Sequence, residues 1–332
     1  MLAHATTPTE ELFPATTTGF LSIANVKQLS EHWDQTQLGK LAKDPLMKPF
    51  VDDLRHQFDR RWAGVEERLG VTIEDLRDVP TGEVGMATIL PAPDDAVTAI
   101  VADVTGNQKG AKELLTRITA HMTKRGAKQS KRLVLGIELL VFDVPKMTTA
   151  DGNDIAAHQT AYFLTDELFG AVDDLKIMIA MVPRLTKGDG AAGPAPAKEE
   201  APATLQTPPK TGTPAKPQAA VAPAAGTLAE VAGFQAVIAR AKADAVAAPQ
   251  VHWYVQPLGY MESLRASTPE RERRKGRSMI DSFKTQGFTA LQAVGGYLDF
   301  ATEGVELVHR TAVYAPGPFQ KSMKMMVFPN HP

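Results

Sequence analysis

The sequence contains no cysteine, which excludes disulfide bonds, thiolate zinc sites and cysteine nucleophiles. No stretch approaches the roughly eighteen uninterrupted apolar residues of a membrane-spanning helix, so we expect no transmembrane segment in this chain. Neither sign of charge dominates, because 36 basic residues are balanced by 38 acidic ones. A chain with a formal charge of −2 has no overall field that attracts nucleic acid, and any polyanion site must be local.

The short motifs of common catalytic and cofactor sites are also absent. HExxH, GxSxG and S-x-x-K do not occur, and no two histidines stand four residues apart. The segment from Asp103 to Leu115 has the strand, glycine loop and helix of a phosphate-binding loop. Its glycines have the wrong spacing, however, and Glu113 stands where such a loop needs Ser or Thr. We therefore predict neither a cofactor nor a metal.

A stretch rich in proline and alanine divides the chain. Residues 187–226 contain no aromatic side chain, and only Leu205 and Val221 are large and apolar, so this stretch cannot form a core. Its prolines favour an extended conformation, which predicts a disordered linker or insertion. The predicted parts are a disordered N-terminus or signal-peptide remnant at 1–17, a first α+β domain at 18–186, the linker at 187–226, and a second α+β domain at 227–332, incomplete at its C-terminus.

The first half opens with a strand and a long helix. A strand over 19–25 is followed by a helical segment near 26–38. The long helix begins at Asp44, a good N-cap followed by Pro45, and ends at Gly70. Its apolar residues recur at helical spacing and predict a stripe that packs on a larger element, namely Met47, Phe50, Val51, Leu54, Phe58, Trp62, Val65 and Leu69.

Strand and helix signals alternate through the rest of the chain. The first half is expected to continue with a hairpin at 83–90 and 96–104, a helix at 111–124, strand runs at 132–144, 159–164 and 167–172, and a helix at 173–184. The second half is expected to contain a short helix at 234–238, a strand that turns into a helix at 251–264, a charged helix at 270–286, and a hairpin at 290–300 and 304–315. This order predicts an α+β protein with antiparallel sheets covered by helices.

The two halves share a weak internal similarity. When Ser22 is aligned with Tyr254 and Gly85 with Gly295, each half shows a strand that turns into helices, followed by a hairpin. This pattern predicts an internal duplication, with two related halves. The same alignment places His252 at the position of Phe20, which favours a packing role for this histidine.

Histidines on predicted strands are the weak candidates for catalysis. A pair formed by His252 and His309, with Tyr254 nearby, could ligate a metal or act as a base if the strands are neighbours. The competing interpretation is that these are hydrogen-bonded residues of the core or the sheet surface. An enzyme would have to bring the two histidines together with acids such as Asp299 and Glu262 in one pocket.

A basic segment is the weak candidate for polyanion binding. It lies in the predicted charged helix and consists of Arg271, Arg273, Arg274, Lys275 and Arg277. Arginine clusters bind phosphate, sulfate and carboxylate polymers. The interspersed Glu270 and Glu272 weaken the field, and no aromatic residue offers a stacking platform for bases. The competing interpretation is a solvated helix face, and a nucleic-acid partner is not expected.

The two ends of the sequence indicate whether the chain is exported and whether it is complete. Ala3-His4-Ala5 has the small-x-small pattern of a signal-peptidase site, but no basic and apolar segments precede it. The chain therefore fits either a signal peptide that starts upstream or a cytoplasmic N-terminus. The second half also stops soon after its hairpin, so we expect the chain to be incomplete at both ends.

The stretch from Leu12 to Phe50 contains an LPAT-like start, a strand and the phrase LSEHWDQTQLGKLAKDPLMKPF. It resembles the opening of a family of large extracytoplasmic bacterial proteins of unknown function, known from Planctomycetes. The matching residues are Trp33, Thr36, Leu38, Gly39, Leu41, Asp44, Pro45, Pro49 and Phe50. Members of that family carry signal peptides and extend well beyond this length, so the resemblance implies export. It carries over no catalytic residues.

These observations predict a non-enzymatic structural or interaction protein with an extracytoplasmic location and a protein or envelope partner. The alternative is a hydrolase-type enzyme whose site is assembled from distant segments, and a weaker alternative is a polyanion-binding module that uses the basic segment. An enzyme requires several titratable groups with shifted pKa values in one pocket, whereas an interaction protein does not.

Overall fold

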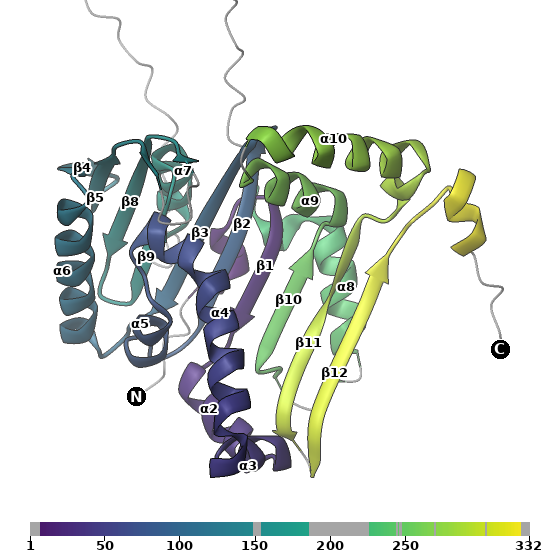
Figure 1. Ribbon diagram of the computed structural model, residues 1–332, viewed down its shortest axis with the longest axis horizontal. Helices are drawn as coiled ribbons and strands as arrows, with labels where there is room; N and C mark the ends of the chain where they lie inside the picture. Colours follow the sequence, from purple (N-terminus) through teal and green to yellow (C-terminus); the bar gives the residue numbers. More distant parts are fainter. Residues whose placement is uncertain are drawn as a thin grey trace, which may run out of the picture.

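A computed structural model describes residues 7–148, 154–185, 226–243, 245, 248–268, 270–302 and 304–326. They form one ten-stranded sheet, in which every pair of neighbours is antiparallel, and helices cover both of its faces (Figure 1). The strand order is β12-β11-β10-β1-β2-β3-β9-β8-β5-β4, and β6 and β7 form a separate pair. The predicted α+β class with antiparallel strands is confirmed.

The strands follow the predicted segments closely. Their bounds are β1 Thr17–Ile23, β2 Val84–Ala92, β3 Asp95–Asp103, β4 Lys128–Val134, β5 Ile137–Val144, β6 Met147–Thr148, β7 Asp154–Ile155, β8 His158–Leu164, β9 Leu168–Val172, β10 Val251–Val255, β11 Ala293–Thr302 and β12 Val305–Tyr314. One prediction was wrong, because the run at 132–144 is not a single strand. Leu135 and Gly136 both have positive φ and turn the chain from β4 into β5, as a tight hairpin requires.

The helices lie on both sides of the sheet. Their bounds are α1 Thr9–Leu12, α2 Val26–Gln35, α3 Gln37–Ala42, α4 Lys48–Leu69, α5 Ile73–Asp78, α6 Gln108–Lys124, α7 Leu175–Leu185, α8 Ala232–Lys242, α9 Pro257–Ala266 and α10 Glu270–Thr285. In Figure 1, α8 lies behind β10 and β11, α4 lies in front of β1 and β2, and α9 and α10 run across one end of the sheet. Among the helices of the described residues, none is both long and apolar enough to cross a bilayer.

The two halves of the chain meet inside this one sheet, between β10 and β1. β1 pairs with β2 on one side and with β10 on the other, so the halves share a sheet instead of forming one each. Ser22 lies opposite Gly85 in the first half, and Tyr254 lies opposite Gly295 in the second. These registers agree with the alignment of the two halves. The internal duplication itself stays a prediction.

Each face of the sheet has its own hydrophobic core. The first core lies between the sheet and α1, α7 and α8, and includes Phe13, Phe20, Phe163, Phe234 and Tyr254. The second core lies under α4 and α6, and includes Leu69, Ile100, Ile118, Phe142 and Tyr162. Strand β3 contributes Ala99 and Val101 to the first core and Ile100 and Ala102 to the second. Burial on both faces explains why this strand is apolar at consecutive positions instead of alternating.

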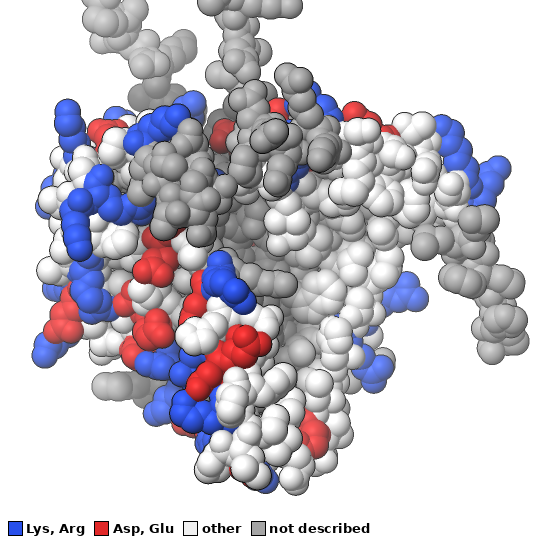
Figure 2. Space-filling view, in the orientation of Figure 1, with Lys and Arg blue, Asp and Glu red and all other residues white. Residues whose placement is uncertain are grey.

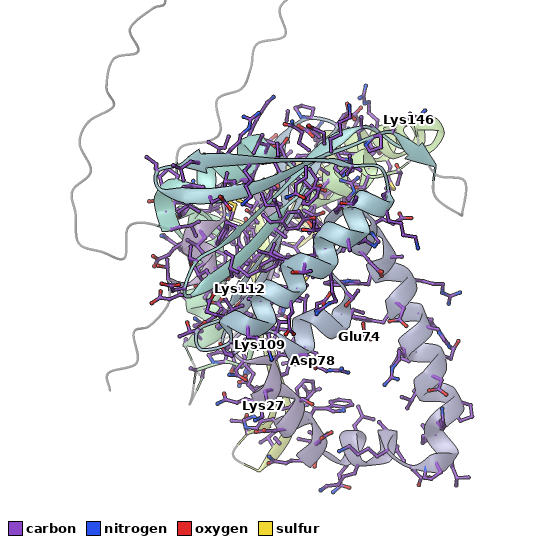
Figure 3. The ribbon with its side chains drawn as sticks, turned by 90° about the vertical axis from the view of Figure 1, so that its left-hand side faces the viewer. Lys27, Glu74, Asp78, Lys109, Lys112 and Lys146 are labelled. Carbon is purple, nitrogen blue, oxygen red and sulfur yellow. The ribbon has the colours of Figure 1, made fainter. Side chains whose placement is uncertain are left out.

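Helix α4 packs along only part of its length, which corrects the prediction of a stripe buried throughout. Its carboxyl-terminal part adds Trp62, Val65 and Leu69 to the second core and ends at Gly70, which has a left-handed φ of 62°. Phe50, Leu54 and Phe58, by contrast, are each more than half exposed. Figure 3 shows this amino-terminal part of α4 standing away from the body of the protein. The predicted stripe is therefore real, but half of it is uncovered.

Candidate functional site

The two candidate histidines do not meet. His252 lies on β10 opposite Tyr297 of β11, and Tyr297 lies opposite Arg310 of β12. His309 is the neighbour of Arg310 on β12, and it lies opposite Leu298. Successive residues of a strand point to opposite faces, so His252 and His309 lie on opposite sides of the sheet. They cannot share a metal or a substrate.

The other candidate residues have separate structural partners. Tyr254 lies on the same face as His252, where its buried ring meets Phe234 edge to face at 5.4 Å. Asp299 accepts the backbone N–H of Gln250 at 2.6 Å. Glu262 on α9 accepts hydrogen bonds from Arg265 at 2.8 Å and Lys284 at 3.0 Å. Within the described part of the chain, no group of three or more His, Asp or Glu side chains is placed to hold a metal ion.

His252 is nevertheless in an unusual environment. Its Nε2 atom is buried and has no hydrogen-bond partner among the residues that the structure describes. Burial, together with the positive charge of Lys242 on α8, lowers the pKa of His252 to about 4. The imidazole is therefore neutral at pH 7, and it packs on the face of the sheet that carries the first core. His309 is exposed and lies beside the Trp253 ring, with 6.1 Å between ring centroids.

Sequence reasoning missed a polar cluster on the face that carries His252. Glu83, just before β2, accepts the hydroxyl groups of Thr9 at 2.6 Å and Ser22 at 2.5 Å, and it also accepts the Thr9 backbone N–H at 3.2 Å. We call these three residues the Glu83 cluster. A side chain at Gly85 would collide with Thr9, so this glycine makes room for α1 against the sheet. The three residues come from separate segments, and no local sequence pattern predicts that they meet.

The Glu83 cluster contains a Ser and a Glu near a His, but it is not arranged for nucleophilic catalysis. Ser22 lies opposite His252 on the neighbouring strand, yet its hydroxyl donates to Glu83 instead of to the imidazole. A serine nucleophile needs a base that accepts its proton and room for a substrate, and Ser22 is only 3% exposed. Because Glu83 binds Thr9 of α1 and Ser22 of β1, the cluster attaches α1 to the sheet. Burial and the nearby negative charge of Glu83 raise the pKa of the neighbouring Glu10 carboxyl group.

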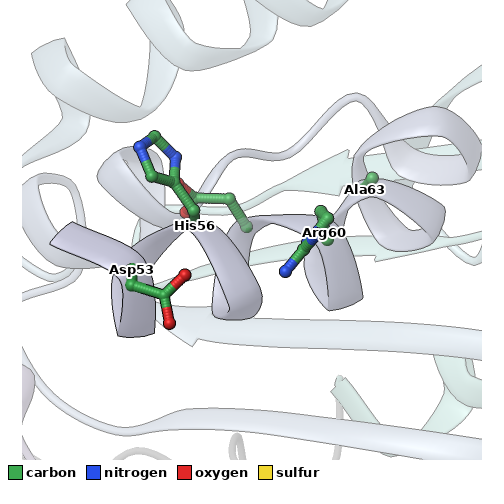
Figure 4. Close-up of a pocket in the computed structure, with 5 residues that line it drawn as sticks. Asp53, His56, Arg60 and Ala63 are labelled. Atoms are coloured by element: carbon green, nitrogen blue, oxygen red, sulfur yellow. The ribbon is translucent and has the colours of Figure 1, made fainter. Parts of the chain in front are cut away.

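Two surface depressions are lined by other residues. One is lined by Asp53, His56, Asp59, Arg60 and Ala63, which all belong to α4 (Figure 4). The other is lined by Thr7, Glu11, Arg184, Gly226, Thr227, Ala229 and Glu230. In the second depression Arg184 donates to the carbonyl groups of Leu12 and Gly226, both at 2.7 Å, so its guanidinium holds the chain together there. Neither depression contains a histidine or tyrosine of the predicted site.

The basic segment lies on α10 as predicted, but most of its side chains fall outside the described residues. This applies to Arg271, Arg273, Arg274 and Lys275. Arg277 is described and donates to Asp94 in the turn between β2 and β3 at 3.1 Å. Arg265 on α9 binds the other oxygen of the same carboxylate at 2.5 Å. These contacts attach α9 and α10 to the end of the sheet.

One face of the second half is largely uncovered. It is the face of β1, β10, β11 and β12 opposite α8, and we call it the open face. Leu21, Val305, Leu307 and Val313 lie on it and are 37%, 48%, 49% and 50% exposed, and Trp253 and Leu298 lie beside them half-buried. Trp33 of α2 covers one end through an edge-to-face contact with Phe300 at 5.2 Å. Figure 2 shows few charged side chains over these strands, in contrast with the surface around α4 and α6.

Replacing His252 by phenylalanine should remove part of the acid sensitivity of the protein. The folded-state pKa of about 4 lies below the unfolded value near 6.5, so the unfolded chain takes up a proton first as the pH falls. The native protein should lose about 1–3 kcal/mol of stability between pH 6.5 and pH 4, an amount reduced by partial exposure of the ring. Urea unfolding at several pH values measures this slope.

The corresponding control is His309→Phe, because His309 is exposed on the other face. This change should leave the pH slope of the wild-type protein intact. We also expect neither variant to change the metal content of the purified protein. A stoichiometric metal that disappears in His252→Phe would contradict the packing role and favour an enzyme.

No protein-family model, no curated protein and no solved structure matches this chain.

Proposed function

We propose that this chain is a non-enzymatic structural or interaction protein that binds a protein partner through its open face. The observation that carries the proposal is the row of apolar side chains on β1 and β12, Leu21, Val305, Leu307 and Val313, which stay 37–50% exposed. Removing apolar surface from water contributes about 25 cal/mol per Å², so a face of this kind is stabilised by a partner that covers it. The uncovered stripe of Phe50, Leu54 and Phe58 on α4 adds a second apolar surface.

The partner should be apolar and shaped to fit a sheet, such as the apolar side of an amphipathic helix. A helix already covers the opposite face of the same strands, where Phe234 and Val237 of α8 pack in the first core. An external helix on the open face would complete the same layered arrangement. Binding by apolar contact also agrees with the small net charge of the chain, which offers no long-range attraction.

The hydrolase alternative is less well supported. It would need the titratable groups of the chain to converge, whereas His252 and His309 lie on opposite faces and Glu262 and Asp299 are engaged elsewhere. The polyanion alternative rests on the basic segment of α10. Its one described member, Arg277, pairs with Asp94.

An extracytoplasmic location is part of the proposal. The Ala3-His4-Ala5 motif and the resemblance of residues 12–50 to exported bacterial proteins both agree with it. The test is cell fractionation with an antibody against the chain. The protein should appear in the envelope or the medium, and recovery only with cytoplasmic markers would contradict export.

Photo-crosslinking tests the open face directly. A benzophenone amino acid placed at Leu307 or Val313 should form an adduct with the same partner protein at both positions when the chain is produced in its native cells. The matched control is Leu133 on β4, which is apolar and 75% exposed but lies at the other end of the sheet. Mass spectrometry of the adducts identifies the partner. Equal labelling at Leu133, or no adduct at either test position, would contradict the proposal.

A further inference from the structure

The two edges of the sheet are protected to very different degrees. A strand at a sheet edge presents unpaired backbone N–H and C=O groups, and proteins commonly shield such edges with lysine and other charged side chains. The β4 edge follows this rule, because its seven residues include Lys128, Lys131 and Arg132. Two copies of β4 would bring cations together, so this edge resists pairing with itself.

The β12 edge lacks this protection. It is ten residues long, no other strand of the described residues pairs with its outer side, and it carries Val305, Leu307, Val308 and Val313. Its charged residues are one acid and one base, Glu306 and Arg310. A long, apolar edge strand of nearly zero net charge is a surface on which another strand can pair.

We propose that β12 pairs with β12 of a second copy of this chain, antiparallel and centred on Val308, so that one sheet continues through both copies. The inference goes beyond the proposed function, because it uses the strand edge and not the open face.

Charge selects this arrangement. In an antiparallel pair centred on Val308, Glu306 of each copy lies directly opposite Arg310 of the other, which gives two attractive pairs. A parallel pairing in register would place Glu306 beside Glu306 and Arg310 beside Arg310. Antiparallel registers centred on either charged residue would also bring like charges together, and like charges directly opposite are destabilising. Only the register centred on Val308 places Glu306 of each copy opposite Arg310 of the other copy.

The side chains on the edge agree with this register. Glu306 accepts the backbone N–H of Gln37 through Oε2 at 2.5 Å, which holds the carboxylate in place and leaves Oε1 for the guanidinium of the other copy. Val308 would meet Val308 at the two-fold axis, and Leu307 would lie opposite His309. Pairing would also make the open faces of the two copies continuous, which doubles the surface available to an apolar partner.

A single cysteine tests the pairing. The chain has no cysteine, so Val308→Cys introduces the one thiol in the protein. Residues directly opposite in an antiparallel pair have Cβ atoms about 4.5–5.5 Å apart, close to what a disulfide needs. Mild oxidation should convert Val308→Cys into a covalent dimer at least about tenfold faster than Lys131→Cys on the charged β4 edge. Equal rates for the two variants would overturn the proposal.

A charge exchange provides the second test. Glu306→Arg and Arg310→Glu should each weaken the dimer by about tenfold or more in sedimentation velocity, because each change creates two repulsive pairs. The double variant restores opposite charges and should return to within about threefold of the wild type. Arg310→Glu leaves the contact between Glu306 and Gln37 intact, so it separates loss of pairing from loss of folding. A wild-type protein that stays monomeric at every concentration, or a dimer indifferent to these changes, would overturn the inference.

Discussion

Replacing Arg68 by alanine should destabilise the protein by about 3–5 kcal/mol, because it leaves a buried carboxylate without its cation. Asp173 is buried at the end of β9, where one oxygen accepts the N–H of Thr98 at 2.6 Å and the other binds Arg68 at 2.9 Å. Arg68 also donates to the carbonyl of Ala96. The pair therefore joins the end of α4 to β3 and β9, and chemical unfolding in urea measures its contribution.

The matched control removes both charges. In the double variant Arg68→Met with Asp173→Asn, the amide can still accept from Thr98 and no unpaired charge is buried, so at least half of the lost stability should return. The single variant should also be less impaired at low pH. Burial raises the pKa of Asp173, and without Arg68 the carboxyl group takes up a proton more readily, which removes the penalty. A loss of under about 1 kcal/mol in Arg68→Ala would contradict this account.

Replacing Tyr254 by alanine should cost about 3–5 kcal/mol, which is usual when a large buried ring is deleted. Tyr254 lies opposite Phe20 across the pair of strands that joins the two halves, and both rings contact Phe234 edge to face. Deletion of the Tyr254 ring therefore opens a cavity at the place where the two halves meet. Thermal unfolding should keep a single cooperative transition at a lower temperature.

Tyr254→Phe separates packing from chemistry. It keeps the ring and deletes only the hydroxyl group, so we expect a change within about 1 kcal/mol. If the hydroxyl group had a catalytic role, Tyr254→Phe would lose activity although its stability is nearly unchanged. A loss in Tyr254→Phe as large as that in Tyr254→Ala would contradict the packing role.

Local signals in the sequence predicted most of the elements. Asp44 accepts the N–H of Leu46 in the turn that leads into α4, and Gly70 ends α4 in the left-handed conformation, as their residue types indicate. Hairpins were also predictable, because each depends on a short turn between two apolar runs. The turn at Leu135 was missed because leucine rarely adopts a positive φ, and nothing before Gly136 indicates that the strand ends.

Contacts between distant segments were not predictable in this way. The pairing of β1 with β10 joins two halves that the sequence presents as separate domains, and no local pattern specifies it. The opposite orientation of His252 and His309 follows from strand alternation, but only once the register of β10 with β11 and of β11 with β12 is known. The Glu83 cluster has the same origin, since Thr9, Ser22 and Glu83 become neighbours through the sheet.

The pairing of β1 with β10 inside the sheet also affects how the chain folds during synthesis. During synthesis β1 emerges early, and β2 reaches it soon afterwards, but its other partner emerges only when most of the chain has been translated. Until β10 emerges, one edge of β1 stays unpaired. Closing the long loop between β1 and β10 is a slow step. A translational pause or a chaperone that protects this edge should therefore raise the yield of native protein more than any change in the last strands.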